Sequence, residues 1–171
     1  VELRLEGFEL QVDVGLLDAL ADSLLHLLRN AVDHGIEAPD VRRDRGKPET
    51  GLIRVGASRQ GNQLVIDVAD DGAGLDYERL RARGVAAGRL SGEHAAAADE
   101  ARLRELVFLP GFSTASAVSE ISGRGVGLDV VRASVQALNG RISLASAAGA
   151  GVTFTLRVPM TIAVVRSVIV Q

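Results

Sequence analysis

The feature that most constrains this chain is an alternating run at residues 64–69 that ends in Asp70 and Asp71, followed by Gly72 and Gly74. Alternation of apolar and polar side chains is typical of a half-buried strand, and the glycines mark the turn after it. The pattern therefore predicts a strand that leads two carboxylates into a tight loop, where they could face a ligand. Taken alone, the same residues also suit a solvated β-turn, because Asp-Gly is ordinary turn chemistry.

A calcium loop is the other interpretation of this stretch. Asp67, Asp71, Gly72 and Glu78 fall at positions one, five, six and twelve of an EF-hand loop. Position three, however, is Ala69, and a strand rather than a helix leads into the loop. The calcium interpretation therefore fails.

Composition bounds the class of protein. With 171 residues, 47% of them hydrophobic, the chain suits one globular domain with a sizeable core. It contains no Cys, which excludes disulfides and thiolate metal sites, and a net charge of −3 gives no case for nucleic acid or an anionic membrane. Neither a spanning apolar run nor a signal peptide is visible, so we expect a cytoplasmic protein.

The domain organisation follows from the two ends. The chain begins with Val1 rather than Met, which suggests a piece of a longer protein. Residues 161–170 are apolar and β-branched and follow Pro159, as expected for the first strand of another domain. We therefore predict one domain at 1–159 and the truncated start of a following regulatory domain at 160–171.

Residues 16–34 follow helical spacing, with Gly35 at the expected stop. The polar stripe holds His26, Asn30, Asp33 and His34, which fall within an arc of about 100° and could converge on one object. A solvated polar face is the alternative, although such a face more often uses Glu, Lys or Arg. The predicted apolar stripe consists of Leu17, Leu20, Leu24, Leu27, Leu28 and Ala31.

The remaining elements follow from the same patterns. Residues 1–13, on either side of Gly7, predict two short strands or a hairpin, and the charged residues 37–51 predict a surface excursion with room for a short helix. The other predicted strands are 53–57, 64–69, 142–145 and 152–158, and the other predicted helices are 76–87, 99–108 and 129–138.

Two further patterns are compatible with an anionic ligand. Arg79 and Arg83 share a helix face, although an exposed basic turn would look the same. Gly123, Gly125 and Gly127 run into a helix, where backbone amides can approach a phosphate. No hydrophobic strand precedes these glycines, so they are not a dinucleotide fingerprint, and Pro48 after Lys47 excludes a P-loop.

The order of these signals resembles the ATP-binding domain of the GHKL superfamily, which includes sensor histidine kinases, gyrase-type topoisomerases and large heat-shock chaperones. Residues 26–37, 110–114 and 122–129 more closely resemble the chemotaxis histidine kinases of the CheA type. The resemblance implies an α/β fold, a two-layer sandwich of helices on a mixed β-sheet. It also implies that ATP lies between helices beneath a mobile lid at about residues 88–123.

The resemblance assigns roles to individual residues. Asn30 would coordinate Mg²⁺, Asp70 would accept a hydrogen bond from the adenine amino group, and His34 would lie near the nucleotide. Gly72 and Gly74 would give the base room. Gly123, Gly125 and Gly127 would wrap the phosphates, with Arg79 and Arg83 facing them. Further nucleotide-binding positions are Asp33, Leu75, Ser113, Thr114, Arg124, Val126 and Leu128.

His26 separates the branches of the superfamily. The hydrolysing branches carry a Glu one turn before the magnesium Asn, where it activates water as a general base, and this chain carries His26. The resemblance therefore implies phosphoryl transfer to a partner side chain rather than efficient hydrolysis. His26 would act on the γ-phosphate or the nucleophile, or would only orient Asn30. An ATP-driven clamp and a non-catalytic ATP-binding scaffold are the alternative functions.

The resemblance also implies partners. His26 and His34 lie at the expected pocket and His94 in the expected lid, so the phosphoacceptor should lie elsewhere. In kinases of the CheA type it lies on a separate histidine phosphotransfer domain, and a response regulator then receives the phosphate. Other domains dimerise the kinase and bind a coupling adaptor and chemoreceptors, so this chain alone should be a monomer.

Overall fold

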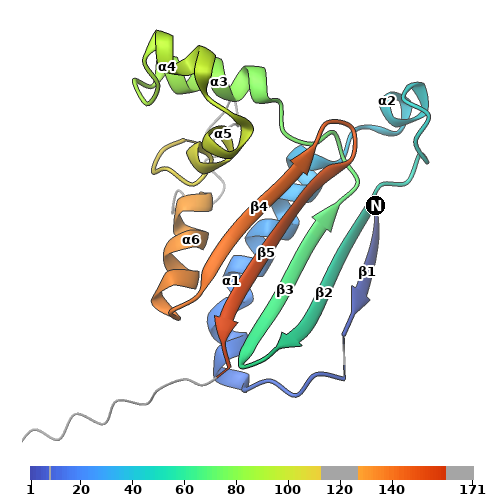
Figure 1. Cartoon of the computed structure of the whole chain (residues 1–171). Coiled ribbons are helices and arrows are strands. Elements are labelled where there is room, and N and C mark those ends of the chain that lie inside the picture. The colour runs from blue at the N-terminus through green and yellow to red at the C-terminus, as the bar shows by residue number, and fades with distance from the viewer. Residues whose placement is uncertain (8, 113–126, 161–171) are drawn as a thin grey trace, which may run out of the picture.

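A five-stranded mixed sheet with helices on one face forms the domain (Figure 1). The computed structural model describes residues 1–7, 9–112 and 127–160. The strand order is β1-β2-β3-β5-β4, in which β1 runs parallel to β2 and the other neighbours are antiparallel. The strands are β1 Glu2–Glu6, β2 Leu52–Gln60, β3 Gln63–Asp70, β4 Arg141–Ala147 and β5 Gly151–Pro159.

The helices form one layer against this sheet. Helices α1 and α6 lie along the sheet, and α3, α4 and α5 gather near the end at which β3 finishes (Figure 1). The helical elements are α1 Val14–Asn30, the π-helix η1 Ala31–Gly35, α2 Pro39–Asp44, α3 Tyr77–Ala86, α4 Gly92–Ala97, α5 Glu100–Leu106 and α6 Leu128–Ala137. The predicted two-layer α/β sandwich with a mixed sheet is thereby confirmed.

Alternation along β3 decides which side chains meet the helices. Leu64, Ile66 and Val68 are buried in the core that includes α1 and α6. Asp70 continues this series, so its side chain lies on the helix-covered face. Asp67 belongs to the opposite face, where the Thr155 hydroxyl donates to its Oδ1 at 2.6 Å. The strand thus places its two acidic side chains on different sides of the sheet.

Most predicted elements are confirmed within a residue or two of their ends. They include β3, the pair β4–β5, and the helices α3, α5 and α6. The predicted β2–β3 hairpin around Gly61 is also confirmed, although β2 continues to Gln60, three residues past its predicted end. The excursion at 37–51 holds the short helix α2. Among the described residues, no helix combines the length and apolar character needed to cross a bilayer. The domain boundary predicted at 159/160 stays a prediction.

One prediction at the amino-terminal end was wrong and another was partly wrong. The described residues of 1–13 form a single strand, β1, rather than two strands or a hairpin, and β1 pairs in parallel with β2 from a distant part of the chain. The predicted apolar stripe of the first helix is confirmed except at Leu17, which is 43% exposed; Leu20, Leu27 and Ala31 are buried, and Leu24 and Leu28 pack against the core. The helix begins at Val14 with Asp13 as N-cap and gives way to the π-helix after Asn30.

The first part of the predicted lid packs on the core rather than standing away from it. Leu90, Ala95, Leu103 and Phe112 are all buried. Arg81 of α3 donates to the carbonyls of residues 95, 96 and 98 and so holds the end of α4. Residues 113–123 of the predicted lid lie outside the described residues.

Candidate functional site

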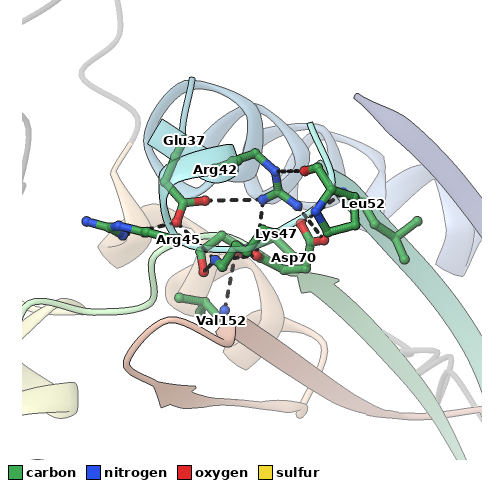
Figure 2. Close-up of polar contacts among 10 residues, drawn as sticks. Glu37, Arg42, Arg45, Lys47, Leu52, Asp70 and Val152 are labelled. Atoms are coloured by element: carbon green, nitrogen blue, oxygen red, sulfur yellow. Dashed lines mark hydrogen bonds and ion pairs between the residues drawn. The ribbon is translucent and has the colours of Figure 1, made fainter. Parts of the chain in front are cut away.

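Asp70 stands at the end of β3 with one carboxylate oxygen held by the backbone. Its Oδ1 accepts hydrogen bonds from the amides of Gly72 at 2.9 Å and Val152 at 3.3 Å (Figure 2). Oδ2 accepts no hydrogen bond from the described part of the chain. A fixed carboxylate with one open acceptor, on the helix-covered face, can receive a donor from a ligand.

Burial raises the pKa of Asp70 above the ordinary aspartate value. The hydrogen bonds from Gly72 and Val152 oppose this rise, and the charges of Asp71 and Glu37 add to it. The ionised form of Asp70 is therefore less favoured than that of an exposed aspartate.

Three glycines allow the chain to close around Asp70. A Cβ on Gly72 would lie 2.0 Å from the Gly35 carbonyl oxygen, and one on Gly151 would lie 1.9 Å from the Asp70 carbonyl oxygen. A Cβ on Gly35 would lie 3.1 Å from the Asp70 carboxyl carbon. Sequence reasoning interpreted Gly35 only as a helix stop and so missed its part in the site.

The π-helix η1 carries the end of α1 to this loop. Its wide turn is closed by a bond from the Ile36 amide to the Ala31 carbonyl at 2.8 Å. The Ala73 amide then donates to the Gly35 carbonyl at 3.0 Å, which joins η1 to the loop after β3. The helix and the glycine loop, 35 and more residues apart in sequence, therefore border one site.

The four polar residues predicted to converge are only partly brought together. His26 and Asn30 are half-buried and share a face of α1, one turn apart. Asp33 and His34 belong to η1 and are exposed. The π-turn changes the angular spacing on which the prediction of a single stripe rested.

His26 faces the start of α6. Burial lowers the pKa of its imidazole, the charge of Arg29 lowers it further, and Asp129 in the first turn of α6 partly opposes the shift. The imidazole is therefore mostly neutral at pH 7, and a neutral imidazole can accept a proton or a hydrogen bond.

Helix α6 begins with no side-chain cap. Gly127 is extended at φ −106° and ψ −179°, and Leu128 opens the helix. Uncapped first-turn amides at a helix N-terminus favour an anion. Six predicted site residues, Ser113, Thr114, Gly123, Arg124, Gly125 and Val126, lie outside the described residues, so their placement stays a prediction.

The loop after Gly72 is tied to the β4–β5 turn. Gly74 has φ +78°, and a Cβ there would lie 2.4 Å from the Ala147 carbonyl oxygen. The Leu75 amide donates to Ser146 Oγ at 2.8 Å. On the following helix α3, Arg79 is exposed and Arg83 half-buried, and neither guanidinium has a partner among the described residues.

A charged cluster of Glu37, Arg42, Lys47 and Asp71 lies against the base of this loop (Figure 2). Arg42 is 0% exposed, and its Nη2 donates to Asp71 Oδ2 at 2.8 Å while its Nε donates to the Pro48 carbonyl at 2.7 Å. The predicted surface excursion therefore includes one fully buried charged side chain. No sequence pattern distinguished Arg42 from the exposed arginines beside it.

Both carboxylates of this cluster are stabilised in the ionised form. Burial opposes ionisation of Glu37 and Asp71, but the hydrogen bonds and charges of Lys47 and Arg42, with backbone bonds, outweigh it and lower both pKa values. A carboxylate whose pKa is lowered by folding stabilises the folded state at pH values above its pKa in the unfolded chain, which is near 4. This stabilisation is lost as the pH falls from there through the lower pKa of the folded state.

We therefore expect the free energy of unfolding to fall steeply below about pH 4. In Glu37→Gln the free energy of unfolding should be lower at neutral pH and should fall less between neutral pH and about pH 3. Urea unfolding at a series of pH values measures both. The control is Glu49→Gln, because the Arg43–Glu49 pair is 64% exposed on both sides and should contribute almost nothing. A Glu37→Gln curve parallel to that of the unmodified chain would contradict the assignment.

Among the described residues, no group of three or more His, Asp or Glu side chains could hold a metal ion.

Comparison with known proteins agrees with this geometry. Residues 19–162 match the family model described as histidine kinase-, DNA gyrase B- and HSP90-like ATPase. The chain belongs to this ATPase family. The predicted superfamily membership is thereby confirmed, and it supplies the ligand class, a nucleotide, that the Asp70 loop and the start of α6 suit.

Named relatives of this ATPase domain are regulators of movement. It is 40% identical over its whole length to "Chemotaxis protein CheA" of Bacillus subtilis and 45% identical to "Gliding motility regulatory protein" of Myxococcus xanthus. These matches confirm the resemblance to the CheA type. The chain spans only 25% and 22% of those two proteins.

Solved structures confirm the fold. The catalytic domain of histidine kinase ThkA matches with a TM-score of 0.56 and 20% identity, over 93% of this chain and 78% of that one. The Erythrobacter litoralis blue-light activated histidine kinase matches with a TM-score of 0.55 and 16% identity, over 93% of this chain and 35% of that one.

Proposed function

We propose that this chain is the ATP-binding catalytic domain of a CheA-type histidine kinase, which transfers the γ-phosphate of ATP to a histidine on a separate phosphotransfer domain. The observation that carries the proposal is the state of Asp70, whose Oδ1 accepts hydrogen bonds from two amides while Oδ2 accepts none from the described residues. In an ATPase family, such an acceptor suits the amino group of adenine.

The remaining roles are proposed from the resemblance to the family. Gly72, Gly74 and Leu75 would border the base. Gly127 and Leu128, at the start of α6, would bind the phosphates together with Gly123, Arg124, Gly125 and Val126. Arg79 and Arg83 offer two cations without described partners. Ser113, Thr114, Asp33 and His34 are proposed to border the nucleotide.

Asn30 is the proposed magnesium ligand. Its amide oxygen is a hard donor one turn after His26, and Mg²⁺ accepts such a donor alongside substrate phosphates and water. Bound there, the ion would neutralise charge on the transferring phosphoryl group. Asn30 and His26 would then hold the reacting end of ATP, with the neutral imidazole positioned to accept a proton or a hydrogen bond.

The kinase proposal is favoured over a hydrolytic clamp by His26. Activation of water in the hydrolysing branches requires a carboxylate at this position, and the chain has an imidazole there. Transfer to a histidine needs positioning and charge neutralisation more than a strong base. The named relatives of the CheA type support the same choice.

The partners are proposed to lie on the rest of the protein. Since the chain spans about a quarter of its relatives, the full-length kinase has room for a phosphotransfer domain, a dimerisation segment and a domain for the coupling adaptor and chemoreceptors. A response regulator would receive the phosphate, and the whole assembly would work in the cytoplasm.

Calorimetric titration tests nucleotide binding. We expect saturable binding of ATP and ADP to the isolated chain, stronger for ATP with Mg²⁺ than with a chelator, because the ion would join Asn30 to the phosphates. Asn30→Ala should remove most of the magnesium dependence while adenosine binding persists. Absence of any nucleotide binding would instead favour a non-catalytic scaffold with a degenerate pocket.

Phosphate transfer tests the kinase assignment. With radiolabelled ATP, the chain should label a phosphotransfer domain from the same kinase, and should not label that domain after its acceptor histidine is replaced. Without the partner domain, release of inorganic phosphate should be very slow. Steady hydrolysis by the chain alone, with no labelling of the partner, would instead support the ATP-driven clamp.

A further inference from the structure

Lys47 reaches the loop that carries Asp70 from outside the proposed pocket. Its Nζ donates to the carbonyl oxygens of Asp71 at 2.9 Å and Gly72 at 2.7 Å, and to Glu37 Oε1 at 2.9 Å. The side chain is only 16% exposed. All three donors of the ammonium group are therefore used, and two of them go to the backbone of one loop.

These bonds orient a peptide group whose other side holds Asp70. The peptide between Asp71 and Gly72 is trans, so its carbonyl and its N–H point in opposite directions. Lys47 and Arg42 Nη1, the latter at 3.3 Å, bind the carbonyl oxygen of Asp71. The N–H of Gly72 on the far side then donates to Asp70 Oδ1 at 2.9 Å. By binding the Asp71 carbonyl, the two cations therefore orient the Gly72 N–H that donates to Asp70.

The energetics argue that this arrangement has more than a stabilising role. Arg42 is wholly buried and its charge is expensive to bury, even though Asp71 and Glu37 compensate it. Packed apolar side chains would often serve stability as well or better. What an apolar side chain cannot do is bind a carbonyl oxygen and set the direction of a peptide plane.

We propose that Lys47, supported by Arg42, is a positioning residue for adenine recognition, acting through the Asp71–Gly72 peptide on the carboxylate of Asp70. The inference rests on the proposed function and adds a determinant of base selectivity that lies outside the pocket. Neither cation touches the nucleotide in this arrangement.

Lys47→Met tests the proposal, with Arg45→Met as its matched control. Arg45 Nη1 bonds the same Glu37 Oε1, at 3.1 Å, but is 51% exposed and bonds no atom of the loop among the described residues. Both variants lose one positive charge and one bond to Glu37. Only Lys47→Met removes hydrogen bonds to the Asp71 and Gly72 carbonyls, and it leaves the Asp71 carbonyl with the longer bond from Arg42.

The readout is the affinity for ATP compared with purine riboside triphosphate, which lacks the 6-amino group. Lys47→Met should bind ATP about tenfold more weakly, the equivalent of one charged hydrogen bond, with little change for the analogue. The preference for ATP should therefore shrink by the same factor. A variant that is partly unfolded lowers both affinities alike, so the ratio isolates positioning from stability.

The outcomes separate the two proposals. If the unmodified chain prefers ATP and only Lys47→Met loses that preference, the positioning role is supported. If the unmodified chain prefers ATP but Lys47→Met keeps the same ratio, or Arg45→Met loses it equally, the positioning role is overturned and the proposed function stands. If the unmodified chain binds neither nucleotide, the proposed function is overturned as well.

Discussion

Asp70→Asn should weaken ATP binding about 100-fold, because an amide whose oxygen keeps the two backbone bonds presents an NH₂ donor, instead of a charged acceptor, to the adenine amino group. The substitution keeps the size of the side chain, so the loss should reflect chemistry rather than packing. Calorimetric titration of ATP on both proteins measures it directly. Unfolding in urea should show at most a small change in stability.

Asp67→Asn is the matched control on the same strand. Asp67 lies three residues earlier on the open face of the sheet, where it accepts a hydrogen bond from Thr155. Because an amide oxygen can still accept that bond, ATP affinity should stay within about twofold of the unmodified chain. An equal loss of ATP affinity in Asp67→Asn and Asp70→Asn would mean that Asp70 does not bind the adenine amino group.

The sequence predicted those parts of the site that depend on local patterns. The alternation at residues 64–69 identified β3 and the carboxylate at its end, and helical spacing placed His26 and Asn30 on one face. One of the two hydrogen bonds to Asp70 Oδ1 comes from Gly72, in the loop that the glycines had marked. These features are encoded within about ten residues, which is the range that periodicity and turn chemistry cover.

The parts that were missed depend on contacts between distant segments. The parallel pairing of β1 with β2 joins Glu2 to Leu52, and no local pattern specifies such a partner. Arg42 is one of several arginines in residues 42–45, and only its approach to Asp71 determines that it is buried. The π-turn after Asn30 likewise follows from the closure of Gly35 on the β3 loop rather than from helix propensity.

Gly151 gives the second large effect, because it combines an unusual backbone angle with a close approach. Its φ is +91°, and a Cβ would lie 1.9 Å from the Asp70 carbonyl oxygen. Gly151→Ala must therefore strain its own backbone and push β5 from the end of β3. We expect the free energy of unfolding to drop by about 3 kcal/mol or more, measured by urea unfolding.

Gly149→Ala separates the two causes. Gly149 lies in the same turn with φ +74°, but a Cβ there would meet nothing within 4 Å. It should cost only the backbone strain, about 1 kcal/mol. The difference between the two variants then measures the contact with Asp70, and a Gly151→Ala variant as stable as Gly149→Ala would show that β5 can move away freely. Since Val152 also donates to Asp70, displacement of β5 should weaken ATP binding even in molecules that remain folded.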